Sequence, residues 1–313
     1  MREEKWERGS TMSSNHFGTV KNRIYMLLCL LAVLVVGLGI YALRERARPG
    51  VTFASENKKA DANERAADAN RQGWQKEPNK PEVLRPDHNH PAFSERVRER
   101  ERMVARDIEE RGVREPNVLA AMRMVPRHSF VRSWDLGRAY ADHPLPIGLN
   151  QTISQPYIVA YMTEALKLDP NSKVFEVGTG SGYQAAVCAE IAREVYTVEI
   201  LEELAKSAKE RLKEIGYRNV TVKAADGYYG WQEKGPFDAI IITAAAGLVP
   251  PPLKEQLKPG GRMILPLGSP YGSQWLVLVT KDRDGKMRSK RVMPVRFVPM
   301  TGRVTEPEEP PKR

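Results

Sequence analysis

The chain predicts an α/β protein with a mostly parallel, twisted β-sheet and an antiparallel edge. The first observation is a glycine-rich turn, because an apolar run at residues 174–177 leads into Gly178, Gly180 and Gly182. A helical pattern over residues 183–192 follows directly, which is how an α/β protein places a nucleotide-like ligand on a parallel sheet. The second observation is that strand and helix patterns alternate beyond this turn, and the third is that turn signals join the last strands.

Three helices are expected before the sheet, each with a start or stop residue in the sequence. Ser94 can cap the first helix and Gly112 can end it. Pro116 suits the first turn of the second helix. A loop-rich stretch separates the second helix from the third. The three expected helices cover residues 94–111, 116–124 and 157–167.

From residue 174 onward, strands and helices are expected to alternate. The run at residues 237–243 is apolar enough for a central strand. Gly216 ends an amphipathic helix, while residues 259–261 (Pro-Gly-Gly) and Asp284-Gly285 are expected to form turns. The expected strands are residues 174–177, 195–200, 220–223, 237–243, 262–267, 275–280, 287–292 and 295–298, and the expected helices between them are residues 183–192, 201–215 and 253–257.

An uncharged apolar segment, residues 24–43, precedes the globular part. It has the about 20 residues that a helix needs to cross a bilayer, and it predicts a single transmembrane helix that acts as an anchor. A cleaved signal peptide is one alternative, although no small-residue cleavage site precedes Arg44, and a buried helix of a soluble protein is another. Basic residues flank both ends, so the charge pattern does not fix the orientation.

Four segments follow from this pattern. Residues 1–23 are a polar N-terminal segment, and residues 24–43 are the expected anchor. Residues 44–92 hold little apolar material to bury, so they are expected to form a flexible tether. Residues 93–313 carry the helical and α/β patterns and are expected to form the globular domain.

The composition argues against several classes of function. The net charge of +10 comes from 49 basic and 39 acidic residues, and the two kinds interleave, so no basic stripe for nucleic acid is predicted. Cys29 and Cys188 lie in unrelated patterns, so neither a disulfide framework nor a thiol metal site is expected. None of the five histidines has the spacing of a metal ligand.

The spacing of Gly178, Gly180 and Gly182 indicates the kind of ligand. Without a Cβ, glycine lets the backbone turn tightly and approach a bound molecule. Tyr183 stands where a dinucleotide fingerprint has another glycine, and no Lys-Ser or Lys-Thr pair follows as in a P-loop. Together with Glu176, the sequence Glu-x-Gly-x-Gly-x-Gly suits a ligand without phosphates, such as S-adenosylmethionine. The alternative is an ordinary turn between a strand and a helix.

Two acidic residues follow later strands, at the edge of the sheet where ligands bind in open α/β folds. Glu199 ends the second strand at about the spacing expected of a carboxylate that accepts hydrogen bonds from ribose hydroxyls. Asp226, followed by Gly227, comes after the third strand and could accept a hydrogen bond from an adenine amino group. A solvated strand end and a simple Asp-Gly turn are the alternatives.

The segment at residues 145–156 places polar side chains just before a helix. Thr152 and Ser154 belong to this cluster, and Pro156 suits the first helical position, which puts Ser154 or Gln155 near the cap. We expect the hydroxyl groups to face the ligand from the side opposite the sheet. A purely capping role for Ser154 is the alternative.

Several segments resemble protein-L-isoaspartate (D-aspartate) O-methyltransferases, especially those of bacteria. The glycine motif alone indicates only the wider methyltransferase fold, whereas the sequence Gln-Thr-Ile-Ser-Gln-Pro is far more specific. Residues 1–90 have no counterpart in the usual compact enzyme. The similar stretches are residues 118–131, 145–166, 174–187, 224–227, 237–245, 257–268 and 295–302.

The resemblance implies a fold, an activity and a set of site residues. It implies a Rossmann-like S-adenosylmethionine-dependent methyltransferase fold. It also implies methyl transfer to the free α-carboxylate of L-isoaspartyl residues in damaged proteins, which initiates their repair. Ser154 maps onto the family's active-site hydroxyl. The residues expected to bind the cofactor, from the patterns and the resemblance together, are Thr152, Ser154, Glu176, Gly178, Gly180, Gly182, Glu199, Asp226 and Gly227.

The expected partners are isoaspartyl-containing proteins and peptides, together with a membrane contacted through the N-terminal helix. The catalytic domain is expected to be monomeric. A cytoplasmic position is slightly favoured because S-adenosylmethionine is made there, and a periplasmic one is the alternative. Two other functions fit the general motifs: a methyltransferase of the same fold with another substrate, and a non-catalytic, membrane-tethered module that binds the cofactor.

Overall fold

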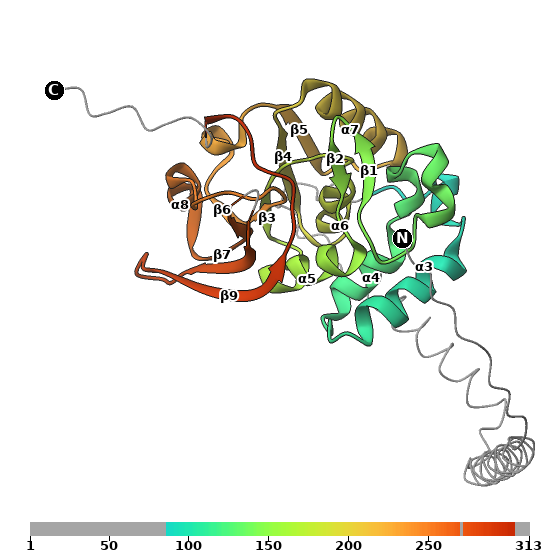
Figure 1. Ribbon diagram of the computed structural model, residues 1–313, viewed down its shortest axis with the longest axis horizontal. Coiled ribbons are helices and arrows are strands. Elements are labelled where there is room, and N and C mark those ends of the chain that lie inside the picture. Colours follow the sequence, from blue (N-terminus) through green and yellow to red (C-terminus); the bar gives the residue numbers. More distant parts are fainter. Residues whose placement is uncertain (1–85, 270–271, 304–313) are drawn as a thin grey trace, which may run out of the picture. The chain divides into compact units, whose positions relative to one another are not determined.

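The computed structural model describes residues 86–269 and 272–303, which form an α/β domain (Figure 1). Its main sheet has seven strands, and helices pack on it. The strands are β3 (Lys173–Val177), β4 (Glu194–Glu199), β5 (Val220–Ala224), β6 (Phe237–Ile242), β7 (Leu257–Gly268), β8 (Gln274–Lys281) and β9 (Met287–Val295). The helices that alternate with them are α5 (Pro156–Leu166), α6 (Tyr183–Ile191), α7 (Glu202–Ile215) and α8 (Pro251–Gln256).

The strand order is β5-β4-β3-β6-β7-β8-β9. Neighbouring strands from β5 to β7 pair in parallel, and β8 and β9 pair antiparallel to their neighbours. The expected parallel sheet with an antiparallel edge is therefore confirmed. β6 is buried at five of its six positions, which suits its long apolar run and its place inside a parallel sheet.

The chain enters this sheet near its middle, in β3, and that decides where a ligand can bind. From β3 the chain moves to β4 and β5 on one side, and it then returns to β6 on the other side. The carboxyl ends of β3 and β6 lie at this reversal of direction. The crevice at such a reversal is the usual ligand site of an open α/β sheet.

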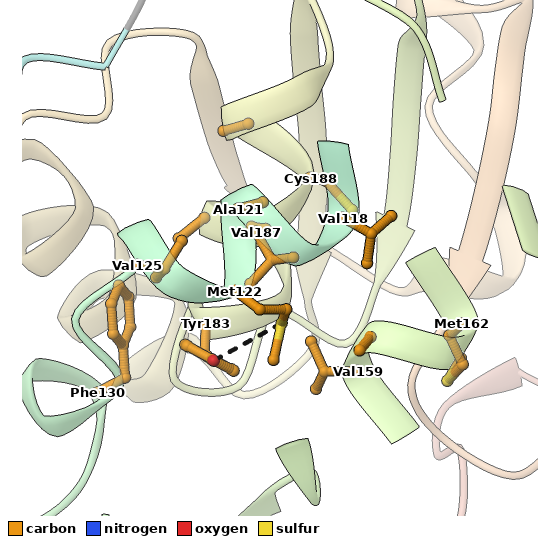
Figure 2. Close-up of a cluster of buried hydrophobic side chains, with 14 of the residues drawn as sticks. Val118, Ala121, Met122, Val125, Phe130, Val159, Met162, Tyr183, Val187 and Cys188 are labelled. Carbon is orange, nitrogen blue, oxygen red and sulfur yellow. Dashed lines mark hydrogen bonds between the residues drawn. The ribbon is translucent and has the colours of Figure 1, made fainter. Parts of the chain in front are cut away.

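A helical N-terminal part packs on the sheet domain through α4 (Pro116–Met124), which contacts α5 and α6. Figure 2 shows Val118 and Met122 of α4 beside Tyr183 and Val187 of α6. The Tyr183 hydroxyl donates to the sulfur of Met122 at 3.9 Å. Cys188, also on α6, is fully buried in this cluster. The second expected helix, residues 116–124, is confirmed.

The first expected helix is only partly correct. Residues 94–111 contain α3 (Val97–Met103) followed directly by a π-helical segment, η2 (Val104–Glu109). Ser94 does not cap α3, because its hydroxyl donates to the carbonyl oxygen of Pro91 and thereby closes a preceding 3₁₀ turn.

A hairpin that was expected to be loop joins the helical part to the sheet. It consists of β1 (Leu145–Gly148) and β2 (Gln151–Ile153), which pair antiparallel. Leu149 and Asn150 form its turn with φ angles of 51° and 58°. Two consecutive positive φ angles are typical of the tight turns that match the twist of a hairpin.

Two expectations at the C-terminal end of the sheet were wrong. Residues 259–261 were expected to form a turn before a strand, but they lie within β7, where the register with β6 shifts between Phe237 and Ala239. The two expected last strands, residues 287–292 and 295–298, are largely one strand, β9.

The predicted anchor at residues 24–43 and most of the predicted tether at residues 44–92 lie outside the described residues. Within the described part of the chain, no helix combines the length and the apolar character that crossing a membrane requires.

Candidate active site

A cavity lies at the crevice between the carboxyl ends of β3 and β6. Its walls combine glycine backbone, apolar side chains and one carboxylate. The residues expected to bind the cofactor that line it are Thr152, Gly178, Gly180, Glu199 and Gly227.

Thr243, which follows β6, fixes the glycine loop that follows β3. Its backbone N–H donates to the carbonyl oxygen of Val177 at 2.9 Å, and its hydroxyl donates to that of Gly178 at 2.7 Å. Gly178 has a φ angle of 93°, and a Cβ there would lie 2.4 Å from the Thr243 hydroxyl oxygen. Glycine is therefore required for this close approach, which exposes loop backbone to the cavity.

Glu199 supplies the carboxylate of the cavity and is 6% exposed. One carboxylate oxygen accepts a hydrogen bond from the N–H of Gly180 at 2.9 Å, and the other accepts one from the N–H of Leu201 at 3.1 Å. These bonds hold the carboxylate against the glycine loop. Because each oxygen can accept a further hydrogen bond, the group keeps the capacity to bind two hydroxyls.

The chemistry of this cavity fits S-adenosylmethionine. The glycine backbone permits close approach, Glu199 can accept ribose hydroxyls, and Ile200 and Met300 provide apolar contact for a ring system. No lysine or arginine is found among the described residues that line the cavity, which agrees with a ligand without phosphates.

Gly182 and Asp226 do not line this cavity, although both were expected to bind the cofactor. Gly182 packs against α7, since a Cβ there would lie 3.1 Å from a methyl carbon of Leu212. Asp226 accepts hydrogen bonds from the backbone N–H groups of Tyr228 at 2.9 Å and Arg303 at 2.7 Å. Both residues thus shape the surroundings of the cavity.

Glu176 does not line it either, because its side chain is fully buried beneath the glycine loop. Its Oε2 accepts a hydrogen bond from the Thr197 hydroxyl at 2.5 Å, and its Oε1 has no partner among the described residues. Burial raises the pKa of Glu176 to about 8. The side chain is therefore a neutral acid at pH 7. The Thr197 hydroxyl in turn lies 2.6 Å from that of Thr179 in the loop.

A second cavity adjoins the first, since Thr152, Thr243 and Val298 line both. Ser154 lines the second cavity and not the first. Its hydroxyl makes no hydrogen bond to any described residue, so it is available to a ligand. Thr152 lines both cavities, whereas Ser154, which was also expected to bind the cofactor, lines only the second.

Arg127 holds the backbone of Ser154 from behind, a role that the sequence did not reveal. The guanidinium is fully buried and donates to the carbonyl oxygens of Ala139 and Ser154, each at 2.8 Å. Desolvation lowers the pKa of Arg127. The guanidinium also lies over the ring of Tyr183, 4.8 Å from its centroid. A buried arginine without a carboxylate partner is costly.

Asp142 is a second residue that the sequence analysis missed. It accepts hydrogen bonds from the backbone N–H of Tyr157 at 3.0 Å and from the side-chain amide of Gln155 at 2.6 Å, and it pairs with Arg111 at 2.5 Å. Gln155 occupies the N-cap position of α5, as expected, while the side-chain hydrogen bond to the first turn of the helix comes from Asp142. Asp142 also fixes the Gln155 amide at the wall of the second cavity.

Residues 298–301, in the segment after β9, line the first cavity. Ala245 anchors this segment, donating its N–H to the carbonyl oxygen of Val298 and accepting from the N–H of Met300, both at 2.8 Å. The bond from the Arg303 N–H to Asp226 ties its far end to the loop after β5. We refer to residues 298–303 as the strap.

No group of histidine, cysteine, aspartate and glutamate side chains in the described part of the chain could hold a metal ion.

Comparisons with known proteins support a single family. The family model for protein-L-isoaspartate(D-aspartate) O-methyltransferase matches residues 98–305. Protein-L-isoaspartate O-methyltransferase 2 of Syntrophobacter fumaroxidans is 58% identical over 188 residues, which cover 60% of this chain and 76% of that protein. Protein-L-isoaspartate O-methyltransferase of Opitutus terrae is 56% identical over 206 residues, which cover 66% of this chain and 88% of that protein.

Solved structures agree with this result. A protein-L-isoaspartate O-methyltransferase structure has a TM-score of 0.61 at 30% identity, covering 66% of this chain and 67% of its own. A second, from Plasmodium falciparum in complex with S-adenosyl-L-homocysteine, has a TM-score of 0.55 at 24% identity and covers 64% of this chain and 98% of its own. The second likeness supports the fold.

Proposed function

This chain belongs to the protein-L-isoaspartate (D-aspartate) O-methyltransferase family, and from this premise we propose how its two adjoining cavities serve one reaction. The enzyme transfers a methyl group from S-adenosylmethionine to the free α-carboxylate of L-isoaspartyl residues, which begins repair of damaged proteins. We assign the cofactor to the first cavity and the isoaspartyl carboxylate to the second. The observation that carries this assignment is the wall of Thr152, Thr243 and Val298 that the cavities share.

S-adenosylmethionine, when bound, supplies a methyl group made electrophilic by a positively charged sulfur. We propose that Thr152, Gly178, Gly180, Glu199 and Gly227 hold it, because these are the expected residues that line the first cavity. Gly182 and Asp226 would act by shaping the cavity. Glu176, as a buried neutral acid, would support the glycine loop through Thr197 and not contact the cofactor itself.

Ser154 would orient the acceptor carboxylate by donating its free hydroxyl. An α-carboxylate has a pKa of about 3.5, so it is ionised and nucleophilic at neutral pH without a general base. This agrees with the second cavity, which no histidine, aspartate or glutamate lines among the described residues. Correct alignment of the reacting groups can contribute on the order of 7–11 kcal/mol.

The strap would exclude water from the cofactor. Val298, Pro299 and Met300 place apolar atoms over the first cavity. An acceptor anion and a cationic donor lose charge as they react, so a site that keeps water away favours the transfer.

The activity is tested with the full-length protein, labelled S-adenosylmethionine, and a pair of peptides that differ only in aspartyl or isoaspartyl linkage. Label is expected on the isoaspartyl peptide alone. Ser154→Ala is expected to lower kcat by about 10²-fold or more, because a misaligned acceptor loses much of the orientation effect, and to leave cofactor affinity within about 2-fold. A Ser154→Ala protein with the wild-type rate would contradict the role of Ser154.

We further propose that residues 24–43 anchor the enzyme in a membrane, that residues 44–92 act as a tether, and that residues 93–313 form the catalytic domain. The support is the sequence, namely an uncharged apolar run followed by a polar stretch. The cytoplasmic face is favoured because the cofactor is made there. Protease treatment of intact and opened cells would decide between the two faces.

A further inference from the structure

The second cavity is lined by one positively charged side chain and no negatively charged one among the described residues. Arg296 is the only residue with a charged side chain among the described residues that line it. The others are apolar side chains, hydroxyls and an amide. A cavity of this kind presents a net positive charge to whatever enters.

Gln274 hydrogen-bonds to the backbone of Phe297, the residue next to Arg296. Gln274 on β8 is 3% exposed, and its side chain accepts from the N–H of Phe297 at 2.7 Å and donates to the carbonyl oxygen of Phe297 at 3.2 Å. Val295 and Phe297 pack against the hydrophobic core. Because side chains alternate along an extended segment, Arg296 between them points away from the core. It is exposed and lines the cavity.

The guanidinium of Arg296 makes no hydrogen bond or ion pair with any described residue. Arg111, in contrast, is neutralised by Asp142, which also accepts a hydrogen bond from the amide of Gln155. An unpaired guanidinium can form two parallel hydrogen bonds to a carboxylate, and such charge-assisted pairs are the strong ones.

We propose that Arg296 binds the carboxylate of the acceptor residue and so determines the preference of the second cavity for an anionic acceptor. This inference rests on the proposed function, because it takes the second cavity to be the acceptor site. Ser154 and Arg296 would then share one carboxylate, with Ser154 orienting it for transfer and Arg296 supplying most of the attraction.

The test compares full-length wild-type protein with Arg296→Met and Arg296→Lys. Binding of two peptides is measured by calorimetry in the presence of S-adenosylhomocysteine: an isoaspartyl peptide, and an isoasparaginyl peptide that has the same shape but no charge. Wild type is expected to prefer the charged peptide by about 10-fold or more, the range of a hydrogen bond between charged groups. Arg296→Met should lose that preference, and Arg296→Lys should keep part of it.

Kinetics provide a second readout. Arg296→Met should raise KM for the isoaspartyl peptide about 10-fold and leave kcat and cofactor affinity within about 3-fold. In wild type, KM is expected to rise with salt, because salt screens the attraction between Arg296 and the carboxylate. In Arg296→Met this rise should be absent. The matched control is Arg288→Met, which removes an exposed arginine of β9 that does not line the cavity. It should behave as wild type.

Equal peptide affinities for wild type and Arg296→Met would overturn the inference. A general loss of affinity for both peptides, with the charge preference intact, would overturn it as well, because that result indicates a structural role. A wild-type protein that binds the charged peptide through Arg296 but transfers no methyl group would support the inference and overturn the proposed function.

Discussion

Arg127 is a charged residue whose proposed role is to position the backbone of Ser154 and not to stabilise the fold. Its guanidinium is fully buried and bonded to the carbonyl oxygens of Ala139 and Ser154. Arg127→Ala is expected to lower kcat by about 10²-fold, because a displacement of Ser154 by about 1 Å misaligns the acceptor. Cofactor affinity should stay within about 3-fold.

Added guanidinium ion separates this role from simple loss of the fold. The ion can occupy the vacated space and should restore part of kcat in Arg127→Ala, in a concentration-dependent manner. Arg123→Ala, which removes a partly exposed arginine of α4, is the control and should need no rescue. If guanidinium had no effect on a folded Arg127→Ala protein, the positioning role would be refuted.

The burial of Glu176 is expected to make the free energy of unfolding depend on pH. Burial raises its pKa from an ordinary 4.5 to about 8. Between these values the folded protein holds a proton that the unfolded chain has released. The free energy of unfolding therefore falls as the pH rises through this window, by at most about 1.4 kcal/mol per pH unit. The stabilisation that this bound proton provides at low pH is lost as the pH rises through about 8.

Glu176→Gln cannot ionise, so its melting temperature is expected to fall less than that of wild type between pH 5 and pH 8. Thermal unfolding at fixed ionic strength measures this difference. Glu233→Gln, at an exposed position, is the control and should follow wild type. Parallel curves for wild type and Glu176→Gln would show that Glu176 is ionised in the folded protein.

At the residue scale, the side chains that could be predicted are those that belong to a local sequence motif. Glu199 and the glycines at 178 and 180 were predicted from a strand end and a glycine turn, and Thr152 from the polar cluster before a helix; all four line the first cavity. Arg127 and Asp142 were missed because their partners come from other segments, and no spacing rule links Arg127 to Ser154 across 27 residues. Glu176 was placed correctly in its strand, but its direction below the loop depends on packing.

The position of the strap depends on one glycine, Gly302. Gly302 has a φ angle of 91°, and a Cβ there would lie 2.4 Å from a carboxylate oxygen of Asp226. Gly302→Ala is therefore expected to weaken binding of S-adenosylhomocysteine by about 5-fold or more, since strain of this kind costs about 1–3 kcal/mol. Calorimetry on the full-length protein measures the affinity.

Gly137→Ala is the control for the strap, because a Cβ at that position would meet nothing within 4 Å. Its affinity for S-adenosylhomocysteine should equal that of wild type. Wild-type affinity in Gly302→Ala would mean that the strap does not contribute to holding the cofactor.

The elements that were predicted best from the sequence have a clear pattern of apolar residues or a clear terminating residue. The helix ending at Gly216 and the apolar strand β6 are examples. The β1–β2 hairpin was missed because its turn uses Leu149 and Asn150, neither of which is glycine, at positive φ. Residues 259–261 were predicted to form a turn because Pro-Gly-Gly is a local turn signal. They lie instead in an irregular part of β7, between the pairs Phe237–Leu257 and Ala239–Arg262.

At the scale of the whole molecule, the proposed anchor lies outside residues 98–305, which the family model matches. Deletion of residues 24–43 is expected to move the protein from the membrane fraction to the supernatant and to leave kcat on isoaspartyl peptides within about 2-fold. The reason is that these residues supply the long apolar run expected to cross a bilayer.

Deletion of residues 51–70 removes a polar stretch of the same length and is the matched control. That variant should remain in the membrane fraction. Membrane association that survives deletion of residues 24–43 would rule out this segment as the anchor.

The burial of Cys188 has a consequence for the conditions under which the enzyme can work. Burial raises the pKa of this thiol to about 12. Because the ionised thiolate is the reactive form, oxidants and alkylating agents find almost nothing to attack at neutral pH. Cys188 is the only cysteine in the described residues. The catalytic domain should thus tolerate peroxide or an oxidising compartment as well as a reducing one, whichever side of a membrane it occupies.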